Sequence, residues 1–344
     1  MRARPHLLGA SLVVAVVAAA ACSSFESTTP DSAASDAAPE TAPTNDASAT
    51  IDTGDDGGLS ADITVLAAGF TDLAGVVATD TTVYFIERTA GIVHAVPLTG
   101  GVPANVQTSA GAPSSIAVGG TDLFWGDRVQ GTLSRKPLAG GAAATATPTP
   151  GLVPAAMVAT SDRLVVVALG DADIGEIHQY GLDFSTSPSI AGQNYPFDVA
   201  VAGFDVFWTE SQAGKIWKAP LGTTVATEVA TLENGCQSIA ADTSGLYWSR
   251  PSDGMVRARL GTSGTITLAS AQKVPTSLAA DASGVYWLTS DGKLRRSTRN
   301  ELPLRTVAQG FSGGFTDPHI QALALTNDYV VWLTTDGKVL RHDK

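Results

Sequence analysis

GLYWSRPSDG, residues 245–254, places two aromatic residues in an alternating apolar run and follows them with an Asp-Gly turn. The same layout recurs as DLFWGDRVQG (122–131), DVFWTESQAG (205–214) and GVYWLTSDG (284–292). A short alternating run that ends at a turn residue is typical of a β-strand entering a hairpin. The repeated segments therefore predict a β protein that is assembled from similar units.

The spacing of these segments predicts the architecture. Seven equivalent positions follow one another at intervals of 39 to 45 residues: Phe85, Trp125, Val166, Trp208, Trp248, Trp287 and Trp332. A period near 40 residues built of short strands indicates a β-propeller, in which each repeat is a four-stranded blade. We expect an all-β fold of seven blades. Six blades is the alternative, because the third repeat has Val166 where an aromatic residue is expected.

One repeat can be divided into its four strands. The inner strand is SIAAD (238–242), and LYWS (246–249), GMVRARL (254–260) and GTITLAS (264–270) follow it outward. The last repeat reaches Lys344 after only three strands, while ADITVLAAG (61–69) resembles the outer strand GTITLAS. Because an open ring would leave an unpaired edge, we expect this N-terminal strand to close the last blade. Asp291-Gly292 and Asp336-Gly337 are expected to form the tight turns between strands.

Four tetrads in the aromatic strands support a family resemblance. YFIE (84–87), FWGD (124–127), FWTE (207–210) and YWSR (247–250) resemble the YWTD-type repeats of lipoprotein-receptor propellers and related bacterial propellers. The resemblance covers nearly all of residues 61–344 and implies that the acidic residues Glu87, Asp127 and Glu210 tie blades together. Arg250, Thr289 and Thr334 depart from the acidic pattern, and that family is commonly six-bladed.

The N-terminal segment predicts export and anchoring. Arg2 and Arg4 precede an apolar run over residues 7–21, which is the layout of a secretory signal. AAAC (19–22) resembles the lipobox of bacterial lipoproteins, which implies a signal peptide over residues 1–21 and a lipidated Cys22. Ordinary secretory cleavage beside a chance cysteine is the alternative. Ser23 and Ser24 then imply sorting to the outer membrane, with membrane contact through the lipid anchor only.

The composition separates a tether from a domain. Residues 22–60 are rich in Ser, Thr, Ala, Pro and acidic residues and contain no Lys or Arg, so we expect a disordered acidic tether. The propeller domain would span residues 61–344. The formal net charge of −12 without a basic stripe argues against nucleic acid as a partner. Cys236 is the only cysteine after Cys22, so we expect no disulfide within the chain and a buried inert thiol at Cys236. We also expect a monomer.

Sequence motifs for catalysis and metals are weak. GFSGG (310–314), with Asp317 and His319 close behind, matches the string of hydrolase nucleophile elbows, but a glycine-rich loop follows Ser312 where the elbow requires a helix. DTGDDGG (52–58) and DADIGE (171–176) both fail the calcium-loop pattern. The sequence therefore predicts no catalytic residue, no bound metal and no cofactor. His94 and His178 share one slot on third strands with Trp217, Arg257 and Arg295, far from the axis.

Two candidate surfaces remain. Polar residues that enter the inner strands should line the axial mouth as a set of neutral hydrogen-bonding groups with one carboxylate: Ser114, Ser115, Asp198, Gln237, Ser238, Thr276, Ser277 and Gln321. The longest connection, from Gln309 to Ile320, should form a second surface on the same face, with Phe311, Phe315, Pro318 and His319 as exposed anchors.

These surfaces lead to three functional hypotheses. The leading one is a lipid-anchored, non-catalytic envelope propeller that binds a protein or a glycan. A metal-assisted enzyme of the lactonase or lyase kind, using Asp198 or His319, is the first alternative. The second is a structural module in envelope assembly.

Overall fold

The computed structural model describes residues 62–147, 150–170, 174–185, 188–298 and 301–344. These residues belong to one compact unit, Ser48–Lys344. The predicted signal peptide, Cys22 and the whole of the predicted tether lie outside the described residues, as does part of the DADIGE segment. Within the described residues, no helix has both the length and the apolar character that crossing a membrane requires.

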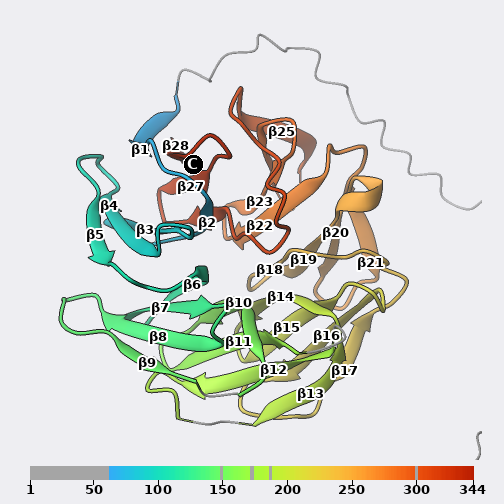
Figure 1. The fold of residues 1–344 in the computed structure, drawn as a ribbon. Helices are drawn as coiled ribbons and strands as arrows, with labels where there is room; N and C mark the ends of the chain where they lie inside the picture. The colour runs from blue at the N-terminus through green and yellow to red at the C-terminus, as the bar shows by residue number, and fades with distance from the viewer. Residues whose placement is uncertain (1–61, 148–149, 171–173, 186–187, 299–300) are drawn as a thin grey trace, which may run out of the picture. The chain divides into compact units, whose positions relative to one another are not determined.

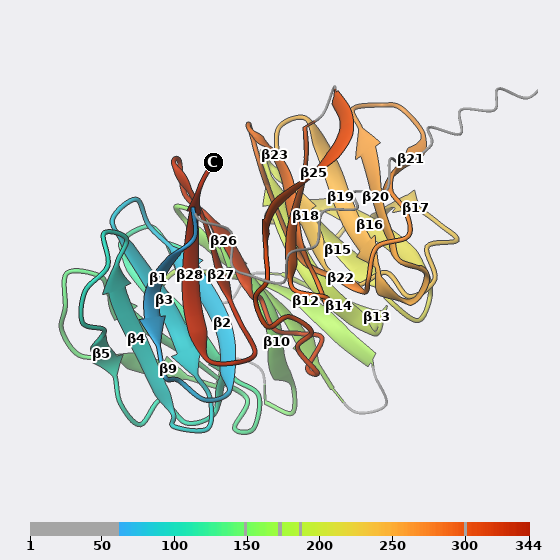
Figure 2. The same cartoon turned by 90° about the horizontal axis from the view of Figure 1, so that it is seen from above.

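Seven four-stranded antiparallel sheets make up this unit and are arranged around a common axis as a β-propeller (Figures 1 and 2). The prediction of an all-β, seven-bladed fold is confirmed, and the six-bladed alternative is wrong. The part of the chain that the structure describes contains one short 3-10 helix, η2 (Pro251–Asp253), and is otherwise strands and connections.

The blades follow the chain in order, each from its innermost to its outermost strand. Blade 1 contains β2 (Leu73–Ala78), β3 (Thr82–Glu87), β4 (Ile92–Pro97) and β5 (Ala104–Gln107). Blade 2 contains β6 (Pro113–Gly119), β7 (Asp122–Asp127), β8 (Thr132–Pro137) and β9 (Ala144–Ala146). Blade 3 contains β10 (Val153–Ala159), β11 (Arg163–Leu169), β12 (Ile174–Gly181) and β13 (Ser189–Asn194). Blade 4 contains β14 (Pro196–Ala202), β15 (Asp205–Glu210), β16 (Lys215–Pro220) and β17 (Thr227–Ala230).

The remaining blades complete the ring. Blade 5 contains β18 (Ile239–Ala241), β19 (Gly245–Arg250), β20 (Met255–Leu260) and β21 (Thr265–Ala269). Blade 6 contains β22 (Pro275–Asp281), β23 (Gly284–Thr289), β24 (Lys293–Thr298) and β25 (Glu301–Gln309). Blade 7 contains β26 (Leu323–Leu325), β27 (Tyr329–Leu333), β28 (Lys338–Asp343) and, from the other end of the domain, β1 (Thr64–Ala68). The strands of blade 5 end within a residue or so of the segments predicted from the sequence.

Strand β1 closes the ring as the sequence predicts. It pairs antiparallel with β28, from Thr64 opposite Arg341 to Ala68 opposite Lys338. Leu66 is 3 % exposed, so the strand contributes to the core as well as to the sheet. The closure satisfies backbone groups of β28 that would otherwise remain at an open edge.

The aromatic repeat position is buried in the core. Trp208, Trp248, Trp287 and Trp332 have no exposed surface, because each lies on the second strand of its blade, where blades must fill the space between them. In blade 3 Val166 occupies the same position and is also buried, opposite His178 on the next strand. Blade 3 therefore keeps all four strands although it lacks the aromatic residue.

Two glycines explain the predicted Asp-Gly turns. Gly292 and Gly337 have φ values of 73° and 78°. A Cβ at either position would lie 1.8 Å from a backbone oxygen, that of Phe311 or that of Phe70. Only glycine combines a positive φ with so close a backbone approach.

The acidic residues of the tetrads connect consecutive blades, as the family resemblance implies. A backbone N–H from the outermost strand of the preceding blade, or from the connection that follows that strand, donates to each acidic side chain. The three pairs are Thr71 N to Glu87 at 3.0 Å, Ala112 N to Asp127 at 3.0 Å, and Asn194 N to Glu210 at 2.7 Å.

Four blades lack the acidic residue: blade 3 has Ala168 at this position, and blades 5, 6 and 7 replace the acid in two ways. In blade 5, Arg250 lies 3.4 Å from the buried carboxylate of Glu233, which comes from the arriving connection, so the charges exchange places. In blades 6 and 7, Thr289 and Thr334 donate to an aspartate two residues later, Asp291 or Asp336.

The topology gives the propeller two distinct faces. Neighbouring inner strands run parallel, as the parallel bridge between Gly75 and Gln321 illustrates at the point where blade 7 meets blade 1. All inner strands therefore begin at one face, which we call the mouth face, and the turns between second and third strands lie there too. The turns between first and second strands and between third and fourth strands form the opposite face.

Candidate functional site

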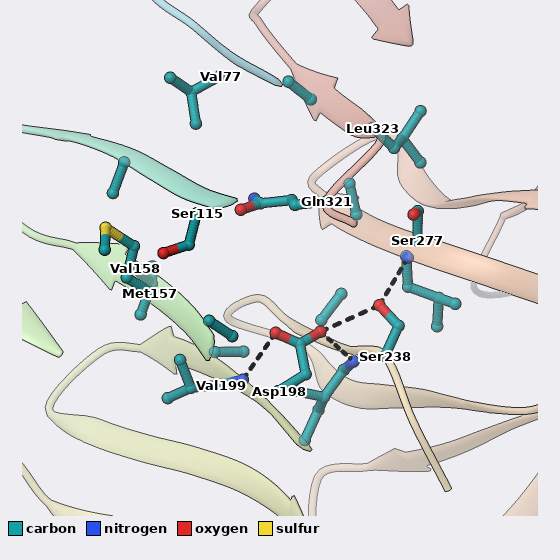
Figure 3. A pocket seen from close by; sticks show the side chains of 18 of the residues that line it. Val77, Ser115, Met157, Val158, Asp198, Val199, Ser238, Ser277, Gln321 and Leu323 are labelled. Atoms are coloured by element: carbon teal, nitrogen blue, oxygen red, sulfur yellow. Dashed lines mark hydrogen bonds between the residues drawn. The ribbon is translucent and has the colours of Figure 1, made fainter. Parts of the chain in front are cut away.

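The inner strands enclose a cavity of about 360 Å³ on the propeller axis (Figure 3). Of the eight predicted mouth residues, five line it: Ser115, Asp198, Ser238, Ser277 and Gln321. Ser114, Gln237 and Thr276 are not among the residues that line it.

A local irregularity accounts for two of the three residues that the prediction misplaced, Ser114 and Thr276, while Gln237 precedes strand β18. The pairing shifts by one residue near the start of several inner strands, for example between Pro113 and Ser115 and between Thr276 and Leu278. Such a bulge changes which side chains point to the axis. The Ser114 hydroxyl accordingly bonds within its own blade, to the Gly126 carbonyl oxygen at 3.4 Å.

A ring of seven equivalent residues, one from each blade, surrounds the axis, and all but Gly75 and Ala322 line the cavity. Each directly precedes the residue that pairs with the aromatic position on the second strand: Gly75, Ser115, Ala156, Asp198, Ser238, Ser277 and Ala322. Six of the seven side chains are small and neutral. Asp198 is the single charged member.

The polar members of this ring connect neighbouring blades. The backbone N–H of Ile239 donates to Asp198 at 3.0 Å, that of Leu278 donates to the Ser238 hydroxyl at 2.9 Å, and that of Ala322 donates to the Ser277 hydroxyl at 3.1 Å. In each case a side chain on one inner strand accepts from the inner strand of the next blade. A hydroxyl and a carboxylate therefore perform the same structural task in adjacent blades.

Asp198 makes two further hydrogen bonds. Its Oδ1 accepts from the Val199 N–H at 2.8 Å, and its Oδ2 accepts from the Ser238 hydroxyl at 3.1 Å (Figure 3). Burial raises the pKa of Asp198 to about 6, although the three donors oppose the shift. At neutral pH the carboxylate is therefore mostly ionised, and it becomes protonated below about pH 6.

Sequence reasoning missed the apolar character of the cavity walls. Side chains such as Val77, Met157, Val158, Val199 and Leu323 line most of the surface (Figure 3). The alternation of small and branched apolar residues along the inner strands was the available signal. Most of the residues that line the cavity are apolar, and neutral polar groups such as Ser115 and Gln321 line it together with a single carboxylate. The cavity is therefore more apolar than the mainly hydrogen-bonding mouth that we expected.

The connection 310–320 lies across the mouth of this cavity and contacts several blades; we call it the strap. Its Asp317 lies 2.6 Å from Arg88 of blade 1 and 3.6 Å from Arg128 of blade 2. On the other side, the ring of His319 stacks on Phe197 of blade 4, with centroids 4.2 Å apart. The strap thereby links the last blade to blades 1, 2 and 4.

The predicted anchors of the strap are less exposed than expected. Phe311 is buried and packs against Trp332, with ring centroids 5.3 Å apart, so the expectation of an exposed Phe311 is wrong. Phe315 is half-buried against the core, and Pro318 is exposed. Burial and the nearby Arg128 lower the pKa of His319 to about 4, so its ring is neutral at pH 7.

The hydrolase-like motif does not assemble into a triad. Ser312 is exposed, the Asp317 carboxylate is engaged by arginines, and neither ring nitrogen of His319 makes a well-formed hydrogen bond. The strap provides no helix after Ser312. The described residues contain no group of three or more His, Cys, Asp or Glu that could hold a metal ion.

The other residues that the sequence singled out have structural surroundings. Cys236 is fully buried and its thiol faces the Glu210 carbonyl oxygen at 3.6 Å, while burial raises its pKa to about 12. The prediction of a buried thiol is confirmed. His94 and His178 occupy equivalent third-strand positions outside the axial cavity, and Glu87 lies 3.2 Å from His94.

Comparison with known proteins places the chain in a structural class. No protein-family model matches the sequence, and no curated protein matches it. Among solved structures, a streptogramin B lyase has a TM-score of 0.62 at 14 % identity, and the match covers 82 % of this chain and 96 % of the other. Virginiamycin B lyase from Staphylococcus aureus gives 0.59 at 13 %, covering 83 % and 99 %.

A third similar structure belongs to a different functional group. The WD40 repeats of RRP9 match with a TM-score of 0.67 at 12 % identity, covering 83 % of this chain and 98 % of the other. Lyases and WD40 repeats thus share this architecture with the chain at very low identity. The likeness defines the chain as a seven-bladed β-propeller and carries no information about its activity.

Proposed function

We propose that the chain is a non-catalytic recognition module that binds a protein or a glycan through its mouth face. Two residues of that face carry the proposal. Leu232 is 82 % exposed with φ 61°, and Val274 is 47 % exposed with φ 45°. Each residue is unfavourable in two respects. Its side chain exposes apolar surface to water, and its backbone adopts the left-handed conformation that disfavours residues other than glycine.

The wider distribution of unusual backbone supports the same face. Six non-glycine residues with positive φ lie in the connections that enter inner strands: Asp72, Ser109, Tyr195, Leu232, Ala271 and Val274. Conformations of this kind cost about 1–3 kcal/mol each and gather at binding and switch sites. Connections held by a rigid scaffold are also the usual place for binding residues.

Glycine substitutions test the proposal without endangering the fold. Leu232→Gly and Val274→Gly remove the exposed side chain and relieve the positive φ, so both variants should be at least as stable as the parent chain. Val225→Gly is the matched control, because Val225 is 70 % exposed in a connection of the opposite face. Each immobilised protein would be offered an envelope extract, with glycan arrays in parallel.

The outcome separates the alternatives. We expect a specific partner to be retained by the parent and Val225→Gly proteins and lost by the two mouth-face variants. A partner that all four proteins retain equally, or no partner at all, would contradict the proposal. A stable stoichiometric complex would favour the structural role in envelope assembly over reversible recognition.

The same proposal includes an anchor. Cys22 would carry the lipid, residues 22–60 would serve as the tether, and the propeller would range from the outer membrane as a YWTD-like lipoprotein. The AAAC segment and the acidic composition of the tether support this. Metabolic labelling with a palmitate analogue tests it: the parent chain should be labelled, and Cys22→Ser should not.

A further inference from the structure

The charge of Asp198 exceeds what its structural role requires. Ser238 and Ser277, at equivalent positions, accept the N–H of the next blade with a neutral hydroxyl. Gly75 and Ala156 fill the same position with no polar side chain. A buried carboxylate is less favourable there than a hydroxyl, because ionised groups lose hydration. The fold therefore has no need of a charge at this one position.

The carboxylate is also directed toward usable space. Asp198 lines the cavity and retains partial exposure, although the adjoining Phe197 and Val199 are buried. Its Oδ1 accepts only the N–H of Val199, while Oδ2 accepts two donors. A carboxylate oxygen has about two acceptor sites. Oδ1 thus keeps capacity for a donor that arrives through the cavity.

The side chains that line the cavity determine which charge and which apolar part a ligand that donates to Asp198 would need. Asp198 and His319 are the only titratable side chains among the described residues that line the cavity, and no Lys or Arg lines it. Arg88 and Arg128 are paired with Asp317 in the strap. The lining therefore carries a single negative charge at neutral pH, and the other side chains that line the cavity are neutral and mostly apolar.

We propose that the axial cavity binds a small organic cation, a molecule with one ammonium group and an apolar body, for which Asp198 supplies the counter-charge. A cavity of about 360 Å³ lies within the range of small-molecule sites. The ammonium donates to Oδ1, and the apolar body contacts the side chains of the inner strands. This site is separate from the exposed connections of the proposed function, so either proposal stands if the other fails.

Benzylamine is a suitable probe, with benzyl alcohol and benzoate as neutral and anionic counterparts of similar shape. Isothermal titration of the whole chain at pH 7.5 should show one benzylamine site and much weaker binding of the other two compounds. Asp198→Ser introduces the residue that blades 5 and 6 have at the equivalent position. It should weaken benzylamine binding about tenfold or more, since the ion pair is lost. Asp205→Ser, which removes an acid of the same blade outside the cavity, should leave the affinity unchanged.

The pH dependence provides a second readout. Benzylamine affinity should fall as the pH drops through about 6, because Asp198 becomes protonated, while His319 with a pKa of about 4 stays neutral over most of that range. The proposal is overturned if benzylamine shows no binding at pH 7.5, if benzyl alcohol binds as well, or if Asp198→Ser retains the parent affinity. Leu232→Gly should bind benzylamine normally, which keeps this test distinct from that of partner recognition.

Discussion

Replacing Asp198 by serine should stabilise the propeller at neutral pH but much less at acidic pH. Burial raises the pKa of this carboxyl from 3.8 to about 6 in the folded state. Each pKa unit corresponds to about 1.36 kcal/mol, so keeping Asp198 ionised costs the folded state roughly 3 kcal/mol at pH 7.5.

The sign follows from proton binding. Between about pH 4 and pH 6 the folded chain holds a proton on Asp198 that the unfolded chain has released, so this group lowers stability as the pH rises. Serine has no such dependence. The advantage of Asp198→Ser over the parent should therefore be larger at pH 7.5 than at pH 4 by about 2–3 kcal/mol.

Urea denaturation of both proteins at the two pH values measures this difference. Changes in packing or hydrogen bonding caused by the substitution do not depend on pH, and the other titrating groups are common to both proteins. Both contributions therefore cancel when the stability difference between the two proteins at pH 7.5 is compared with that at pH 4. Asp205→Ser is the control, because Asp205 lies outside the cavity in a partly exposed pair with Lys218 at 3.1 Å. The reasoning is refuted if the stability difference between Asp198→Ser and the parent is the same at both pH values.

Three further predictions concern closure, the strap and the thiol. Leu66→Ala in the closing strand should lower the unfolding free energy by about 2–4 kcal/mol, whereas Val65→Ala at a 46 % exposed position should change it by less than about 1 kcal/mol in urea denaturation. Asp317→Asn should loosen the strap and speed amide hydrogen exchange over residues 310–320 by roughly tenfold, with exchange in β27 unchanged, since it weakens a part-buried pair with Arg88. Cys236, whose pKa is raised to about 12, should not react with a thiol reagent at pH 8 until the chain is unfolded, and rapid labelling of the native protein would contradict its burial.

Local patterns predicted most of the fold. Short segments of sequence were enough to predict the aromatic position that includes Trp248, the Asp-Gly turns and the missing strand of the last repeat. Strand alternation and turn geometry depend on neighbouring residues, so such features can be recognised locally. The closing role of β1 was predictable for a related reason: a three-stranded last repeat and one spare strand can satisfy each other only by pairing.

The candidate site was only partly predictable. Asp198 and Ser238 were expected at the mouth and line the cavity, whereas Ser114 and Thr276 were expected there and do not. A one-residue bulge reverses which side of a strand faces the axis, and no sequence signal at these positions indicates it.

The sequence by itself determined that the chain forms a ring of similar four-stranded sheets and which segment completes the last one, because those features follow from periodicity and backbone pairing. Only the tertiary structure decided that Asp198 is the one charged side chain lining the axial cavity and that Asp317 fastens the strap to Arg88. Such contacts join residues that are 229 positions apart, as in the Arg88–Asp317 pair. Their distances are fixed by the closure of the ring, which no local segment encodes.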